Sequence, residues 1–275
     1  MIDDALTAGV EAAIRAAAAE EIMPRWRQLA DDDVLQKAGP HDLVTTADRS
    51  AEAHLRRALP ALLPGSAFVG EEGVHADPAM LHALHGEAPV WIVDPVDGTR
   101  QFVRGEEGFC TLVALAHRGE LLASWTYQPA RELLATAWRG GGATLDGRVL
   151  TTGSPESGAP LRVATDHPDF IDDERRRALL RLRTEGIAPR PTGSAGLEYL
   201  AVARGELDAL AYSWELPWDH AAGLLLVTEA GGTHATGDGT PFTLTGGNAL
   251  PFVAARDEAT RGRILSVLAG ANPGR

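Results

Sequence analysis

The stretch Trp91–Phe102, written WIVDPVDGTRQF, sets two carboxylates three positions apart directly after an apolar run. The apolar run Val90 to Val93, which leads into this stretch, is typical of a buried strand. Asp-Pro and Asp-Gly are common turn dipeptides, so the sequence predicts a stiff turn after that strand. A surface turn would need no function. The question is whether Asp94 and Asp97 do more than make a turn.

The pattern around this stretch predicts two mixed halves. A helix is expected over Leu6–Trp26, ending near Pro24, and another after Asp48, ending at Pro64. Apolar runs then predict an antiparallel meander of strands: 90–93, 109–116, 121–127 and 133–138. Further on, the expected elements alternate: strand 161–164, helices 174–185 and 194–204, strand 207–212, and a helix from Trp218 that Gly231-Gly232 closes. We therefore expect two sub-domains, residues 1–145 and 146–275.

Composition limits the partners and the compartment. The 275 residues are 44% hydrophobic, and 38 acidic against 25 basic residues give a formal charge of -13. That charge argues against a nucleic acid polymer or an anionic membrane surface as partner. The single cysteine, Cys110, lies in an apolar run and reads as a buried structural thiol of a reducing compartment. With neither a secretory signal nor a membrane span, the expected location is cytoplasmic.

Three more acids stand in short motifs: Asp48 in DLVTTAD, Glu71 in VGEEG and Asp219 in PWDHAAG. Singly, each has a structural explanation, as a helix N-cap, a solvated loop charge and an acid of a first helical turn. Together with Asp94 and Asp97 they offer the oxygen ligands that a hard cation such as Mg²⁺ requires. The sequence therefore predicts a magnesium site.

The residues inside the expected turn fit phosphate chemistry at such a site. The proline between Asp94 and Asp97 fixes φ, so that both carboxylates and the Val96 carbonyl can converge on one point. Two ions there could bridge a phosphate and orient a water molecule. Thr99 could take a proton from that water, and Gly98 lets the backbone approach an oxyanion closely.

Other enzyme chemistries lack their motifs. The chain has no G-x-S-x-G, no G-x-x-x-x-G-K-[ST] and no H-E-x-x-H. The phospho-aspartyl pattern D-x-D-G-T is closer. Here, however, D-P-V-D-G-T is one residue longer, which would misplace the second carboxylate as acid to the first.

With these motifs in hand, the chain resembles the inositol monophosphatase family, Mg²⁺-dependent and lithium-sensitive phosphomonoesterases. The resemblance covers most of the chain, and its motifs, in order, are DLVTTAD (42–48), VGEEG (69–73), WIVDPVDGTRQF (91–102), ATAWRGGGATLDG (135–147), GSAGLEYLAVARGELDA (193–209) and PWDHAAGLLLVTEAGG (217–232). It implies an α+β fold, an alternating αβαβα layered sandwich of the inositol monophosphatase and sugar phosphatase type, and a homodimer.

The resemblance also implies a ligand set for two or three Mg²⁺ ions. Glu71, Asp94 and the Val96 carbonyl match the ligands of the first ion. Asp94, Asp97 and Asp219 match those of the second, with Asp94 bridging. Glu71 also reaches a weaker third ion.

Catalytic roles follow in the same way. Thr99 and Asp48 match the pair that orients and deprotonates the attacking water, with Glu71 beside them. The N–H groups of Gly98 and Thr99 match phosphate contacts, and Asp97 and Asp219 border the substrate. Lys37 matches a mobile-loop lysine of some members, and a solvated lysine is the alternative.

The substrate pocket departs from the family pattern. Members that act on inositol phosphates usually have a Glu seven residues before the W-D aspartate, and here that position is Tyr212. Glu215 would replace it only in a rearranged loop. Gly193, Ser194 and Ala195 match a segment that lines the leaving-group pocket, and an N-cap explains Ser194 equally well.

The sequence thus predicts a hydrolase that uses a metal-bound water to attack a small phosphorylated polyol or alcohol. Histidinol-phosphatase is the first alternative within the family, followed by fructose-1,6-bisphosphatase and 3′-phosphonucleotide phosphatase. A remote alternative is a non-catalytic, metal-binding regulator. All five acidic or hydroxyl ligand positions, Glu71, Asp94, Asp97, Thr99 and Asp219, are present, which argues for an enzyme.

Overall fold

A computed structural model describes residues 3–37 and 43–270 of the protein, so Asp42 of the DLVTTAD motif lies outside the described residues. The strands of the described residues build two β-sheets and a two-stranded ribbon. The larger sheet has the order β3-β4-β5-β6-β7-β8-β9, in which only β3 and β4 pair in parallel. Its strands are β3 (Ala67–Gly70), β4 (Val90–Asp97), β5 (Cys110–His117), β6 (Glu120–Gln128), β7 (Leu133–Trp138), β8 (Gly142–Leu145) and β9 (Arg148–Val149).

The smaller sheet has the order β11-β10-β12-β14-β13. Strand β10 pairs in parallel with β11 and β12, and the remaining pairs are antiparallel. Its strands are β10 (Leu161–Thr165), β11 (Ile187–Pro191), β12 (Ala209–Tyr212), β13 (Thr233–Ala235) and β14 (Phe252–Ala255). A separate ribbon pairs β1 (Val34–Gln36) with β2 (Leu43–Thr45).

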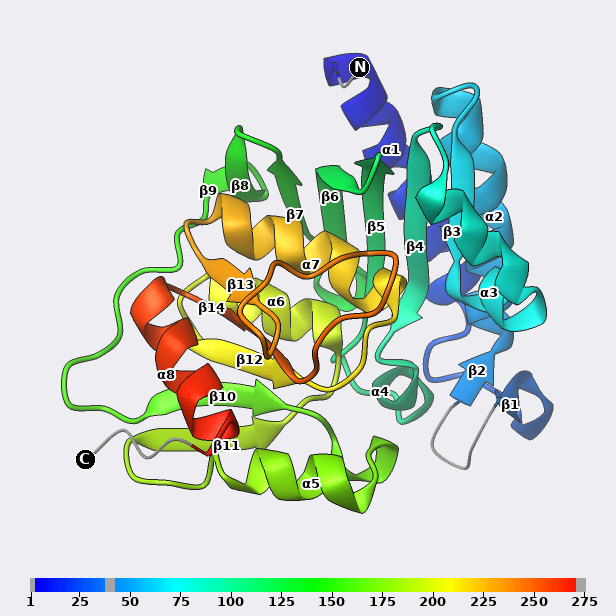
Figure 1. The fold of residues 1–275 in the computed structure, drawn as a ribbon. Helices are drawn as coiled ribbons and strands as arrows, with labels where there is room; N and C mark the ends of the chain where they lie inside the picture. The colour runs from blue at the N-terminus through cyan, green and yellow to red at the C-terminus, as the bar shows by residue number, and fades with distance from the viewer. Residues whose placement is uncertain (1–2, 38–42, 271–275) are drawn as a thin grey trace.

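Helices cover both faces of each sheet, which gives the five layers of Figure 1. The outer helices are α1 (Asp4–Ala17) and α2 (Thr46–Leu62) on the larger sheet and α5 (Asp173–Leu180) and α8 (Glu258–Leu268) on the smaller one. Helices α6 (Ala195–Ala203) and α7 (Pro217–Glu229) lie between the sheets. The predicted α+β, αβαβα sandwich is therefore confirmed.

Side-chain alternation along the strands explains this layering. In β4, Trp91 and Val93 pack with α1 and α2, whereas Ile92 packs on the other face with α7. In the smaller sheet, Leu210 packs toward α6 and α7, and its neighbour Ala209 packs toward α8. Because successive strand residues point to opposite faces, both sheets bury both faces.

The predicted meander of strands is confirmed, and so is the helix closed by Gly231-Gly232, which is α7 and ends at Glu229. The φ of Gly231 is +95°, and the Gly232 N–H donates to the Val227 carbonyl at 2.9 Å, as in a left-handed helix cap. Two predicted helices are too long. Helix α1 ends at Ala17 and continues as a π-helical turn over Ala18–Ile22, which keeps Ile22 in the core.

Helix α5 ends at Leu180 instead of residue 185, because the chain turns there to enter β11. Strand β11 escaped prediction because it contains Pro189 and Pro191, which are tolerated only on an edge strand. The following elements were not predicted either: helices α3 (Glu71–Ala76), α4 (Thr99–Val103) and α8, strands β1, β2, β3, β8, β9, β13 and β14, and the 3-10 turns at 31–33, 78–85, 129–131 and 168–170.

The predicted turn at Asp94–Asp97 is wrong. These residues continue β4, with Asp94 opposite Leu112 and Asp97 opposite Cys110, so three steps on β4 face two on β5. Between these two pairs β4 therefore holds one residue more than β5, which is a β-bulge. Within the described residues, no helix is both long and apolar enough to cross a membrane.

Candidate active site

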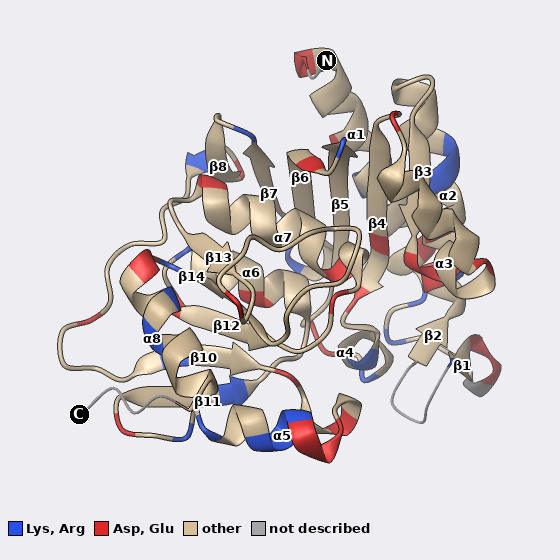
Figure 2. Ribbon diagram, in the orientation of Figure 1, with Lys and Arg blue, Asp and Glu red and all other residues tan. Residues whose placement is uncertain are grey.

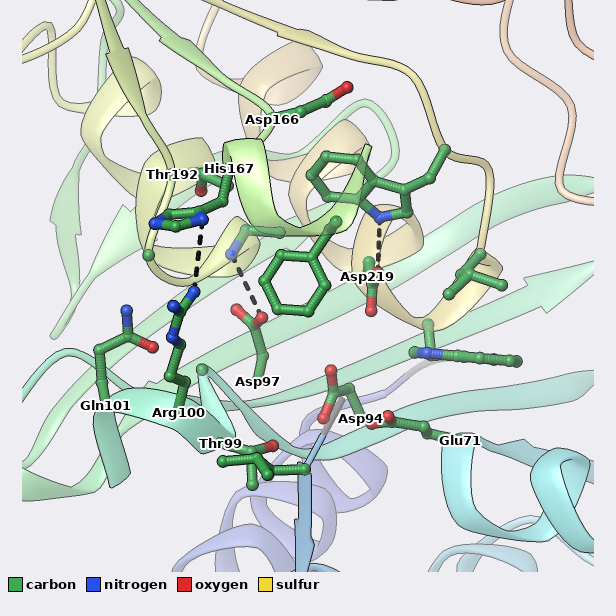
Figure 3. A pocket seen from close by; sticks show the side chains of 18 of the residues that line it. Glu71, Asp94, Asp97, Thr99, Arg100, Gln101, Asp166, His167, Thr192 and Asp219 are labelled. Carbon is green, nitrogen blue, oxygen red and sulfur yellow. Dashed lines mark hydrogen bonds between the residues drawn. The ribbon is translucent and has the colours of Figure 1, made fainter. Parts of the chain in front are cut away.

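A cleft of about 500 Å³ opens where β4 ends, at the N-terminal ends of α3, α4, α6 and α7. Figure 3 shows the carboxylates of Asp94, Asp97 and Asp219 turned toward a common space, with Thr99 and Glu71 at its edge. The predicted site residues that line the cleft are Glu71, Asp94, Val96, Asp97, Gly98, Thr99, Gly193, Ala195 and Asp219. Segments that are far apart in the sequence thus meet in one place.

The bulge in β4 positions the first acid. The Val96 N–H donates to Asp94 Oδ1 at 3.0 Å, and the Thr111 hydroxyl donates to the Pro95 carbonyl at 2.9 Å. Gly98 then takes φ +88°, the left-handed conformation that turns the chain into α4. A Cβ at this position would lie 2.7 Å from the Gly108 carbonyl oxygen. Only glycine therefore fits there.

Asp97 ties the larger sheet to the start of α6. Its Oδ2 accepts from the Ser194 hydroxyl at 2.5 Å and from the Gly196 N–H at 2.7 Å, while Oδ1 accepts from the Ala195 N–H at 3.2 Å. Burial raises the pKa of Asp97, and these hydrogen bonds act in the opposite direction. Ser194, which is 3% exposed, also caps α6 through the Leu197 N–H, so it supports Asp97 and does not itself line the cleft.

Thr99 and Asp48 form a hydrogen-bonded pair. Thr99 Oγ1 lies 3.1 Å from Asp48 Oδ1 and 3.0 Å from the Val96 carbonyl oxygen. Asp48 is not the N-cap of α2. That residue is Thr45, whose N–H and hydroxyl donate to Asp48 Oδ2 at 2.8 and 2.5 Å, a capping box. Burial raises the pKa of Asp48 to about 6, although the Thr45 hydroxyl opposes the shift.

Glu71 begins α3 and faces a lysine. The Lys37 ammonium lies 2.6 Å from one oxygen of Glu71 and 2.6 Å from one of Glu72, and its side chain is only 4% exposed. Burial alone would lower the pKa of Lys37, but the two carboxylates raise it above its ordinary value. A solvated lysine is therefore excluded. Figure 2 shows the acidic residues of α3 and β4 side by side.

Trp214 was not predicted as a site residue. Its Nε1 donates to Asp219 Oδ2 at 2.6 Å, and its carbonyl oxygen lies 3.0 Å from His220 Nε2. A carbonyl only accepts, so His220 donates from Nε2 and accepts from the Tyr199 hydroxyl at Nδ1, 3.0 Å away. Burial lowers the pKa of His220 to about 3, so the ring is neutral. The tryptophan five residues before Asp219 was the available sequence signal.

The acids of the cleft suit a divalent cation. Burial, and then the charge of Glu71, raise the pKa of both Asp94 and Asp219 well above the ordinary range. Their oxygens, with those of Asp97 and the Val96 carbonyl, form an oxygen-only donor set of the kind that Mg²⁺ prefers. Among the described residues, a tighter group of three ligand atoms occurs only at Glu20, Glu21 and His54, none of which lines the cleft.

The prediction that Tyr212 lines the substrate pocket is corrected. Tyr212 is fully buried and does not line the cleft, because its ring packs among Tyr199, Trp214 and Phe252. Its hydroxyl donates to Thr192 Oγ1 at 3.0 Å, and Thr192 does line the cleft. Glu215 does not replace the family glutamate either, since its Oε2 accepts from the backbone and side chain of Asn248, both at 2.9 Å.

The end of the cleft away from Glu71 is formed by residues that the motifs did not indicate. Asp166 is 2% exposed, with Oδ1 accepting from the Ser213 N–H at 3.0 Å and Oδ2 without a hydrogen-bond partner among the described residues. Burial raises its pKa. Phe170, 53% exposed, and Arg175 complete this end, and Arg100 pairs with Asp169 beside it.

Comparisons with known proteins all lead to one family. The model of the inositol monophosphatase family matches residues 3–269. An inositol-1-monophosphatase of Rhizobium meliloti is 39% identical over 212 residues, 74% of this chain and 76% of that protein. The Nus factor SuhB of Pseudomonas aeruginosa is 35% identical over 232 residues, 80% of this chain and 82% of that protein. The solved structure of a Thermotoga maritima IMPase covers 98% of both chains at 26% identity, with a TM-score of 0.77.

Proposed function

The chain belongs to the inositol monophosphatase family, a family of phosphoric monoester hydrolases, and we propose that it is an Mg²⁺-dependent hydrolase of a small phosphate ester. One observation carries the proposal: Thr99, which is hydrogen-bonded to the buried Asp48, lines the same cleft as the carboxylates of Glu71, Asp94, Asp97 and Asp219. A proton acceptor and a set of cation ligands are what hydrolysis by water needs in one place.

The metal ligands are those that the family resemblance implies. Glu71, Asp94 and the Val96 carbonyl would hold one ion, and Asp94, Asp97 and Asp219 a second, with Glu71 reaching a weaker third. When bound, such ions neutralise charge on a phosphoryl group and acidify a water molecule. The ions would also remove the mutual repulsion that raises the pKa of Asp94 and Asp219.

The protein's own groups then move the proton. The attacking water gives a proton to Thr99 Oγ1, and Thr99 passes its own hydroxyl proton to Asp48 Oδ1, 3.1 Å away. As the water oxygen bonds to phosphorus, the ester P–O bond breaks, and its electron pair leaves with the alcohol oxygen, which takes a proton from solvent. The N–H groups of Gly98 and Thr99 would hold the phosphoryl oxygens. No covalent intermediate is needed.

The substrate in this proposal is a small phosphorylated polyol or alcohol, with histidinol phosphate, fructose 1,6-bisphosphate and 3′-phosphonucleotides as alternatives. Phosphate release from such a panel, with Mg²⁺ and again with EDTA, tests the function. We expect turnover of at least one ester with Mg²⁺ and its loss with EDTA. Turnover that survives full chelation would contradict the metal dependence.

A second function is favoured by one observation. A relative at 35% identity is named a Nus factor, so a role in regulation without catalysis is a candidate. That role would be supported if no ester of the panel released phosphate. The complete set of carboxylates in the cleft favours the enzyme.

We propose a cytoplasmic homodimer with a small phosphorylated substrate as its partner and no nucleic acid polymer. The buried thiol of Cys110, with its pKa raised well above the usual value by burial, supports a structural cysteine in a reducing compartment.

A further inference from the structure

Trp214 lines the cleft, and its indole packs against the ring of Tyr212. Its ring centroid lies 4.2 Å from that of Tyr212, at an interplanar angle of 32°. Tyr212 is fully buried and packs edge-on against Tyr199 and Phe252, at 6.3 and 6.2 Å. Because Tyr212 cannot shift without disturbing the core, packing against it sets the position of the indole.

Polar contacts fix the indole from two further directions. Its Nε1 donates to Asp219 Oδ2, and the backbone before it is held by Asp166 Oδ1, which accepts from the Ser213 N–H. The backbone of Trp214 itself is held by neutral His220. The rings of Tyr212 and His220 pack against the indole, with centroids 4.2 and 5.2 Å away. Trp214 is nevertheless only half-buried, and the part of its ring that they leave uncovered lines the cleft.

The surroundings of the indole suit a flat ring better than a polyol. Phe170, Ile171 and Leu216 add apolar surface to this end of the cleft. Glu215, whose carboxylate would accept from the hydroxyls of a polyol, lies outside the cleft lining and is occupied by Asn248. An aromatic face binds another planar ring by stacking. The hydroxyl of Thr192, which accepts from Tyr212, can donate its own proton to a nitrogen atom of such a ring.

We propose that Trp214 is a specificity-determining residue, which selects phosphate esters whose alcohol carries a planar heteroaromatic ring over esters of polyols. This inference rests on the proposed phosphatase function. Two kinds of alcohol carry such a ring: a nucleoside and an amino alcohol with an imidazole group. They are distinguished by using adenosine 3′-phosphate and histidinol phosphate as separate arms.

The experiment compares kcat/KM for substrates with and without a ring but with the same class of ester. Glycerol 2-phosphate is the secondary-alcohol control for adenosine 3′-phosphate, and glycerol 1-phosphate is the primary-alcohol control for histidinol phosphate. Inositol 1-phosphate is the polyol of the family name. We expect at least one ring ester to exceed its control and inositol 1-phosphate by about tenfold or more, the scale of one base–aromatic stacking contact.

Two variants separate stacking from the hydrogen bond to Asp219. Trp214→Phe and Trp214→Leu both lose the indole N–H, so both lower turnover of every ester to a similar extent. Only Trp214→Leu loses the flat face. The kcat/KM of the ring ester divided by that of its control should therefore fall about tenfold in Trp214→Leu, mainly through a higher KM for the ring ester. In Trp214→Phe this ratio should stay within about threefold of wild type.

A binding measurement makes the result independent of turnover. Titration calorimetry in EDTA with the free alcohol of the preferred ring ester, adenosine or histidinol, should show binding to wild type and Trp214→Phe and about tenfold weaker binding to Trp214→Leu. Equal losses for all esters in Trp214→Leu, or inositol 1-phosphate as the best substrate, would overturn the inference while leaving the phosphatase function intact. Release of phosphate from none of the esters would overturn the proposed function, and the inference with it.

Discussion

Asp48 uses its two carboxylate oxygens for two purposes. Oδ2 closes the capping box of α2 with Thr45, and Oδ1 lies 3.1 Å from the Thr99 hydroxyl. The sequence offered the helix cap and the catalytic role as alternatives. In the structure Asp48 makes the helix-capping contacts and the contact with Thr99 at the same time, because each uses a different oxygen.

We predict that Asp48→Asn separates the two roles. An amide oxygen still accepts from Thr45, so the free energy of unfolding should change by less than about 1 kcal/mol. An amide cannot accept the proton from Thr99, so kcat should fall by about 100-fold or more. Phosphate release and urea unfolding of the same preparation check both numbers, and unchanged kcat would remove Asp48 from the proton path.

Thr45→Val is the matched control for that variant. It removes the hydroxyl that caps α2 and should cost about 1 kcal/mol of stability, while the carboxylate remains. In wild type, activity should rise with pH through about 6 as Asp48 ionises. The Thr45 hydroxyl lowers the pKa of Asp48, so its removal should move this rise to higher pH.

Gly98 is the residue on which the bend into α4 depends. We predict that Gly98→Ala costs about 2 kcal/mol or more and lowers activity strongly, because its φ is +88° and a Cβ would lie 2.7 Å from the Gly108 oxygen. Gly239→Ala is the control: its φ is +85°, but nothing lies within 4 Å. Thermal unfolding should show the smaller loss for Gly239→Ala, and equal losses would contradict the steric argument.

At the scale of elements, β4 shows what a sequence pattern can and cannot predict. The apolar run and the residue types of the ligands were visible in WIVDPVDGT, and the strand and the acids lie where expected. The bulge was not visible, since Asp-Pro and Asp-Gly favour turns locally. Pairing with β5 overrides that preference, because the Pro95 carbonyl finds a partner in the Thr111 hydroxyl.

The contact between α6 and α7 gives a prediction for the middle layer. Gly223 of α7 faces the Tyr199 ring of α6, and a Cβ there would lie 2.1 Å from Tyr199 Cγ. We predict that Gly223→Ala destabilises the protein by about 2 kcal/mol or more, since the fully buried Tyr199 cannot yield without repacking.

Gly262 of α8 provides the opposite result. No atom lies within 4 Å of its added Cβ, so Gly262→Ala should stabilise the protein by about 0.5–1 kcal/mol through helix propensity. Urea unfolding of both variants checks the pair. If Gly223→Ala proved as stable as wild type, α6 and α7 would not be packed as described.

At the scale of the whole molecule, the layered fold could be predicted from the family resemblance and the alternating patterns. The end of the cleft away from Glu71 could not. Asp166 and Phe170 lie in the connection between β10 and α5, and Trp214 lies in the one between β12 and α7. They belong to no motif, so only tertiary structure brings them together. The proposed division at residues 145 and 146 stays a prediction. Helices α6 and α7, from its second half, pack against both sheets.

The buried acids link the whole molecule's stability to pH and metal. Asp48 and Glu72 have pKa values raised to about 6 and about 7, and those of Asp94, Asp97 and Asp219 are raised too. Between about pH 4 and 7 the folded state therefore binds more protons than the unfolded chain, so the stability of the protein in EDTA should fall as pH rises.

Mg²⁺ should reverse that loss, because it binds the ionised carboxylates of the folded state. We predict a Tm in EDTA that decreases from pH 5 to pH 7.5, and a Tm at pH 7.5 that rises by several degrees when millimolar Mg²⁺ replaces EDTA. Differential scanning calorimetry at the two pH values checks this. A Tm that does not respond to Mg²⁺ at pH 7.5 would contradict the ligand set.

The central claim, that the carboxylates of this cleft support hydrolysis of a phosphate ester, is tested most directly by phosphate release from Asp94→Asn. Asp173→Asn on the surface of α5, whose side chain is 75% exposed, is the charge-matched control. With Mg²⁺ and the best ester of the panel, we predict a loss of at least about 100-fold for Asp94→Asn. Asp173→Asn should turn over at the wild-type rate. Near wild-type turnover by a folded Asp94→Asn would contradict the account.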